Sequence, residues 1–138
     1  MKTNLPLGLA LLAGLAGLAA GPAFAHHSGA MFDRAKSVEL KGVIKQFGWT
    51  NPHAYIAVDV PNAQGVAEEW SIECNSPSQL AAQGLKKSSL KPGDKVSLFI
   101  HPMKDGTKGG SFDAVVLASG ERFSSGGSQT AAATAVVK

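Results

Sequence analysis

The chain has 138 residues, of which 44% are hydrophobic, and it carries 13 Lys and Arg against 10 Asp and Glu, a net charge of +3. This is the size of one domain with an ordinary core, so folding does not require a disulfide or a structural metal. The lysines are scattered and form no basic stripe, which argues against a nucleic-acid partner, and a single cysteine, Cys74, excludes an internal disulfide.

The first 25 residues have the three parts of a secretory signal peptide. Lys2 supplies a positive start, residues 5–20 are an uncharged stretch rich in Leu, Ala and Gly, and Ala23-Phe24-Ala25 is a small-x-small cleavage site. The alternative, a membrane anchor, needs about 20 apolar residues, and this stretch is shorter. We therefore predict export to the periplasm, no transmembrane segment after cleavage, and a mature chain that begins at His26.

After a lead-in at 26–36, the hydrophobic pattern has the period of β-strands. Apolar and polar residues alternate in five stretches, at 38–47, 54–60, 67–74, 95–101 and 111–118. Gly42 in the first stretch indicates a bulge or a sharp coil, as a strand needs when it turns the corner of a small barrel. In the third stretch, Cys74 shares the inward face with Trp70 and Ile72, which favours a core residue over a metal ligand.

A short helix is predicted between the third and fourth strands. Ser76 can cap it, Pro77 suits its first position, and Gln79 completes a capping-box pattern. Gly84 ends it.

Three strands, a helix and two further strands are the order of elements in an OB-like barrel. The predicted fold is therefore all-β: a small five-stranded OB-like barrel over residues 37–123 with one short helix between strands three and four. Gly109-Gly110 is expected in the hairpin loop between the last two strands, and the composition of residues 124–138 predicts a disordered tail. The alternatives are other small barrels and a sandwich, which usually has about seven strands and gives no reason for the helix.

The histidines lie outside the apolar periodicity of the predicted strands, at His26, His27, His53 and His101. In an OB-like barrel, the loop between strands one and two lies beside the loop between strands four and five, and these loops bind ligands. His53 and His101 are thus expected to meet at one rim. Each histidine alone is equally well explained as an exposed polar residue, but the expected convergence favours a metal site.

Cleavage after Ala25 would give His26 an amine and an imidazole that chelate one ion. Together with another imidazole they form a histidine brace, which suits Cu(II) because copper favours nitrogen ligands in tetragonal geometry. His27 can replace either partner, and Met103 is a soft ligand in the loop after His101. Cleavage one residue earlier would instead present Ala25-His26-His27, which chelates Cu(II) or Ni(II) through backbone nitrogens. A lead-in of about ten residues, at roughly 3.3 Å per residue, is long enough to reach the rim.

These features predict a periplasmic metal-binding protein with copper as its cofactor and a carrier or accessory role, whose partners are the metal ion and another envelope protein. The sequence has no Gly-x-Ser-x-Gly elbow, phosphate loop or His-Glu-x-x-His motif, so no motif predicts an enzyme. The alternative is a non-metal binding module whose rim, including Trp49, Asn51, Tyr55 and His101, holds a small molecule, a glycan or a partner protein in the cell envelope. A third possibility is a purely structural envelope component.

The order of several short motifs resembles a known group of proteins. The motifs are His26-His27-Ser28, Met31-Phe32-Asp33, Trp49-Thr50-Asn51-Pro52-His53, Trp70-Ser71-Ile72-Glu73, Ser76-Pro77, Lys91-Pro92-Gly93-Asp94 and His101-Pro102. With them the chain resembles an uncharacterised family, classed as a domain of unknown function, of small exported Gram-negative bacterial proteins. The resemblance implies export and a single small domain, and it brings no activity, substrate or cofactor.

Overall fold

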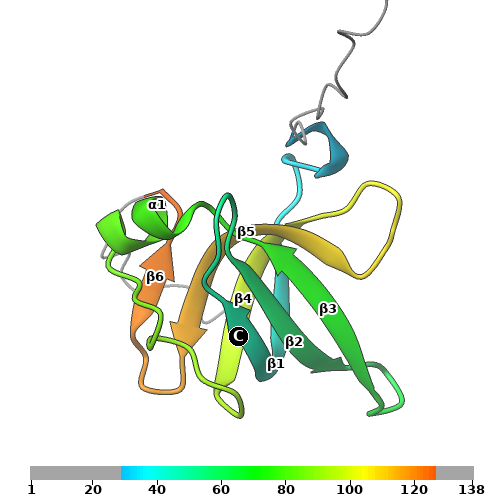
Figure 1. The fold of residues 1–138 in the computed structure, drawn as a ribbon. Coiled ribbons are helices and arrows are strands. Elements are labelled where there is room, and N and C mark those ends of the chain that lie inside the picture. The colour runs from blue at the N-terminus through cyan, green and yellow to red at the C-terminus, as the bar shows by residue number, and fades with distance from the viewer. Residues whose placement is uncertain (1–28, 127–138) are drawn as a thin grey trace, which may run out of the picture.

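The computed structural model describes residues 29–126 (Figure 1). The predicted signal peptide, His26, His27 and most of the predicted tail lie outside these residues. The elements in chain order are η1 (Gly29–Met31), β1 (Val38–Gly48), β2 (Tyr55–Pro61), β3 (Ala67–Glu73), α1 (Pro77–Ala82), β4 (Lys95–Pro102), β5 (Gly109–Leu117) and β6 (Arg122–Ser124). The all-β class and the short helix between the third and fourth strands are as predicted.

Strands β1 to β5 close into a barrel, which confirms the predicted fold. The long strand β1 pairs with β4 through its first half and with β2 through its second half, both antiparallel. The barrel closes between β3 and β5, which run parallel and pair as Ser71↔Gly109, Ile72↔Gly110 and Glu73↔Ser111. The short strand β6, which was not predicted, pairs with the second half of β5, and its last residue, Ser124, is the first residue of the predicted tail.

The core consists of inward-facing residues of the strands together with Leu80 of α1 and Leu85 and Leu90 of the connection to β4. Its members, all nearly inaccessible to solvent, are Leu40, Ile44, Ala54, Ile56, Val58, Ile72, Cys74, Leu80, Leu85, Leu90, Val96, Leu98, Ile100, Phe112 and Val115. Cys74 is 3% exposed, as the apolar alternation predicted, and this burial raises the pKa of its thiol.

The helix α1 begins as its sequence indicates. The Ser76 hydroxyl accepts the backbone N–H of Gln79, and the Gln79 side chain accepts the backbone N–H of Ser76 in return. This capping box satisfies backbone groups that the first helical turn leaves free. Leu80 then points from the helix into the core. Within residues 29–126, no helix has the length and apolar character needed to cross a membrane.

Gly42 does not mark the bulge in β1 that was predicted there. The register between β1 and β2 shifts after Ile44 instead. Gly42 allows a close approach of strands, because a Cβ at this position would lie 2.5 Å from the backbone oxygen of Asp59 in β2. The glycine is thus required by close packing between strands, at the point where β1 passes from pairing with β4 to pairing with β2.

The pair Gly109-Gly110 was predicted in a hairpin loop, but the structure places it at the start of β5. A Cβ on Gly110 would lie 2.6 Å from the backbone oxygen of His101, and one on Gly109 would lie 3.0 Å from that of Ser71. These glycines therefore let β5 fit closely between β4 and β3, where the barrel closes.

Candidate functional site

A cleft of about 910 Å³ lies where the β1–β2 loop, the β4–β5 loop and the lead-in meet, at the upper end of the barrel in Figure 1. Its lining consists of Met31 and Phe32 from the lead-in, residues 50–54 of the β1–β2 loop, Tyr55, Ser71, Glu73, Gly109 and Gly110 from the strands, and Met103, Thr107 and Lys108 from the β4–β5 loop. The two loops that OB-like topology brings together thus place His53 and Met103 on the walls of one cleft.

His53 is held in the cleft by the carboxylate of Glu73, the last residue of β3. Its Nδ1 lies 2.9 Å from Oε1 of Glu73, and its side chain is about half exposed. Thr50 supports the loop by donating its hydroxyl to the backbone oxygen of His53 at 3.1 Å. Because a carboxylate oxygen accepts, Nδ1 carries the proton, and in the neutral ring Nε2 keeps a lone pair.

Glu73 could have been found from strand pairing. It lies opposite Tyr55 in the β2–β3 register, so its side chain points outward beside the residues that precede Tyr55. His53 is two residues before Tyr55. The pattern of alternation showed which face Glu73 occupies, but not which residue it contacts.

His101 has an equivalent arrangement outside the lining of the cleft. Its Nδ1 lies 2.7 Å from the backbone oxygen of Lys36, which can only accept, so Nε2 of the neutral ring again keeps its lone pair. The pairs His101↔Ser111 and Ser111↔Glu73 place His101 in the same outward row as Glu73, two strands away. At about 4.8 Å per strand this is about 10 Å between backbones. The structure therefore brings His101 to the same face as His53, with its ring directed toward the lead-in.

The lead-in is fixed along the β4–β5 loop. Phe32 is 6% exposed and forms an isolated antiparallel bridge with Met103. The amide of Asp33 donates to the oxygen of Pro102 at 2.8 Å, and that of Lys104 donates to the oxygen of Met31 at 2.9 Å. The segment that follows the predicted cleavage site thus forms one wall of the cleft by residue 31.

Tyr55 and Trp49, which were expected together at a binding rim, have different positions. The Tyr55 ring covers Gly48, where a Cβ would overlap the ring, and its hydroxyl accepts from Nε2 of Gln46 at 2.7 Å. Tyr55 therefore lines the cleft as a fixed side chain. Trp49 instead packs edge-to-face on Phe47 at 5.4 Å and against the core.

Two of the predicted ligands, His26 and His27, fall outside the described residues. Within residues 29–126, no group of three or more His, Cys, Asp and Glu side chains is arranged to hold a metal ion. The thiol of Cys74 lies in the core, so its burial separates it from the cleft.

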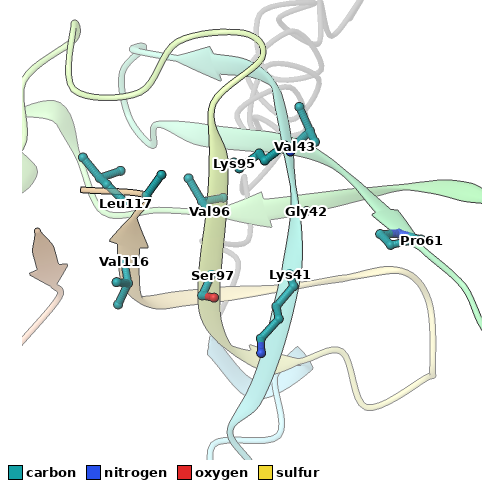
Figure 2. A pocket seen from close by; sticks show the side chains of 10 residues that line it. Lys41, Gly42, Val43, Pro61, Lys95, Val96, Ser97, Val116 and Leu117 are labelled. Carbon is teal, nitrogen blue, oxygen red and sulfur yellow. The ribbon is translucent and has the colours of Figure 1, made fainter. Parts of the chain in front are cut away.

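A second hollow, of about 400 Å³, lies near the other ends of β4 and β5 (Figure 2). Figure 2 shows Val96 and Leu117 to one side of Gly42 and Pro61 to the other. Among the described residues that line this hollow, none is His, Cys or Met. Among the described residues, His53, Met31 and Met103 line the cleft and no such side chain lines this hollow.

Comparison with known proteins gives one match. The family of unknown function (DUF6152) matches residues 15–112, which is more than half of the chain. This confirms the resemblance to an uncharacterised family that the motifs indicated. No curated protein and no solved structure matches the chain.

Proposed function

We propose that this protein, which belongs to the family of unknown function (DUF6152), is an exported copper-binding protein with a carrier or accessory role. The proposed Cu(II) ligands are His26, His53 and His101, and His27 and Met103 are alternative ligands. The proposal rests on one observation, the hydrogen bonding of the two described imidazoles. His53 and His101 both commit Nδ1 to an oxygen acceptor and keep Nε2 available.

This is the arrangement that metal-binding histidines adopt in general. Such a histidine nearly always donates its other ring N–H to a carboxylate or a backbone carbonyl, which fixes the tautomer and makes the free nitrogen more basic. Here the acceptors are the carboxylate of Glu73 and the backbone oxygen of Lys36. The two imidazoles come from remote parts of the chain and lie on one face of the barrel.

The position of the lead-in supports a contribution from the processed terminus. Met31 lines the cleft, and His26 is five residues before it, a separation of at most about 17 Å along the chain. If the signal peptide is removed after Ala25, the amine and imidazole of His26 can chelate an ion whose further nitrogen ligands are His53 and His101. Copper suits such a nitrogen set because it heads the affinity order of the divalent metals.

The test is a Cu(II) titration of protein purified from the periplasm, together with its intact mass, which reports the true terminus. We expect one tightly bound ion, and a large loss of affinity in His53→Ala and in His101→Ala. Glu73→Gln should weaken binding by about 10–100-fold, because it removes only the carboxylate that orients His53. The matched control is Glu69→Gln on the same strand face, whose partner is Lys45 and which should bind as the wild type does. Unchanged Cu(II) uptake in both histidine variants would overturn the proposal.

A second candidate function is binding of a small organic molecule or a glycan. The size of the cleft favours it, since about 910 Å³ is more than one ion fills and is within the range of small-molecule sites, about 300–1,000 Å³. The fixed ring of Tyr55 gives such a ligand an apolar surface. A ligand of this class would raise the melting temperature without copper, and Tyr55→Ala would remove the effect.

A further inference from the structure

Both methionines that follow the predicted signal peptide line the same cleft. The sequence has three methionines, Met1, Met31 and Met103, and the cleft contains the latter two. The antiparallel bridge between Phe32 and Met103 and the hydrogen bond from Lys104 to Met31 hold the two segments against each other. Two thioethers from separate segments therefore border one cleft.

Methionines usually serve as flexible fillers of a hydrophobic core. Met31 and Met103 do not have that role here, because neither belongs to the buried core and both are only partly buried. Their side chains border the cleft, where a solute can reach them. This placement requires an explanation other than core packing.

The lining of the cleft also includes Gly109, Gly110 and Ser71, which contribute almost no side chain. A Cβ on Gly109 would already lie 3.4 Å from Cγ of Met103, so the methionine side chain extends over the glycine. The same lining carries His53, whose Nδ1 is bonded to Glu73 and whose Nε2 has no hydrogen-bond partner among residues 29–126.

We infer that the thioethers of Met31 and Met103, with the imidazole of His53, form a binding site for Cu(I). Thioether sulfur is a soft ligand that selects Cu(I), whereas imidazole suits copper in both oxidation states. This inference rests on the proposed copper function and extends it: the nitrogen ligands bind Cu(II), the sulfur ligands bind Cu(I), and His53 is common to both sets. A carrier with such a cleft accepts copper in either state.

The test uses Ag(I) as a probe with the charge and softness of Cu(I) but no redox chemistry, and then Cu(I) itself under anaerobic conditions against a competing chelator. In protein labelled with ¹³C at the methionine methyl groups, Ag(I) should shift the signals of both Met31 and Met103. The variant Met31→Leu/Met103→Leu conserves volume and should keep the fold, because such exchanges usually cost less than about 1.5 kcal/mol. We expect it to bind Cu(I) at least about tenfold more weakly, with a much smaller loss of Cu(II) affinity, because most of the proposed Cu(II) ligands are nitrogens.

The outcomes separate the two ideas. If the double variant binds Cu(I) as tightly as the wild type, or if Ag(I) shifts neither methyl signal, the Cu(I) site is refuted while Cu(II) binding by the histidines stands. If His53→Ala lowers both Cu(I) and Cu(II) affinity and the leucine variant lowers mainly Cu(I) affinity, the inference is supported. An equal loss of Cu(I) and Cu(II) affinity in the leucine variant would also refute it, because sulfur would then serve both oxidation states alike.

Discussion

Replacing Gly110 with alanine tests how closely the barrel is closed beside the cleft. Gly110 pairs with Ile72 where β5 meets β3, and on its other side it contacts β4. A Cβ would lie 2.6 Å from the backbone oxygen of His101 and 2.7 Å from Cδ1 of Ile100. The side chain of Ile100 can rotate, but the oxygen of His101 can move only if the β4–β5 pairing is distorted.

The cost follows from this geometry. Overpacking a well-packed interior by one methyl group typically costs about 1–3 kcal/mol, and a contact with backbone belongs in the upper part of this range. In a domain of this size each kcal/mol lowers the melting temperature by about 4–8 °C. For a loss of about 2–3 kcal/mol we expect Gly110→Ala to melt about 8–24 °C below the wild type.

Thermal unfolding followed by far-UV circular dichroism measures this difference directly. Gly126→Ala is the control, because a Cβ at this position would have no neighbour within 4 Å among residues 29–126, and the melting temperature should stay the same. Gly109→Ala should fall between the two, since its Cβ would lie 3.0 Å from the oxygen of Ser71. A Gly110→Ala protein that melts within about 2 °C of the wild type would show, at 4–8 °C per kcal/mol, that β5 has room for a side chain there.

Three further predictions concern the core, the helix and the lead-in. Burial raises the pKa of Cys74, so little of the thiol is present as the reactive thiolate. We therefore expect iodoacetamide at mildly alkaline pH to label Cys74 only after the protein is unfolded in guanidinium. Rapid labelling of the folded protein would contradict this. Ser76→Ala removes the capping box of α1 and should cost about 1 kcal/mol in chemical denaturation, whereas a loss near zero would mean that the cap is not needed. Phe32→Ala should release the lead-in from the β4–β5 loop, which would be seen as faster hydrogen exchange of the Asp33 amide, the donor to the backbone oxygen of Pro102. Unchanged exchange would show that other contacts hold the lead-in in place.

The elements that depend on local pattern were predictable. The alternation in β2 and β3 placed Ile72 and Cys74 in the core, and the capping box at Ser76 placed the start of α1. The order of strands around a helix was then enough to predict a closed OB-like barrel, and so the neighbourhood of the β1–β2 and β4–β5 loops. Each of these predictions rests on residues that are near one another in sequence, or on topology alone.

The partners of the site residues were not predictable in the same way. The contact between His53 and Glu73 depends on the register between β2 and β3, which alternation leaves open. The role of Gly110 depends on how closely β5 approaches β4, which the sequence pattern does not show. The pair Gly109-Gly110 therefore resembles a turn in the sequence but belongs to a strand in the structure. The short strand β6 has only three residues, too few to show a period.

Docking of the lead-in connects the fold to the proposed chemistry. A terminus that moved freely would have to be ordered each time it bound a metal, and that loss of entropy would weaken the site. Here Phe32 and the backbone pairing at Met31 fix the chain five residues after His26, and a tether this short corresponds to an effective concentration of about the millimolar range. On the proposed assignment, the amine of His26 is created by signal-peptide cleavage and appears beside His53 at that concentration. On this assignment the precursor lacks the amine, so cleavage completes the proposed Cu(II) site, and tight copper binding is expected only after export.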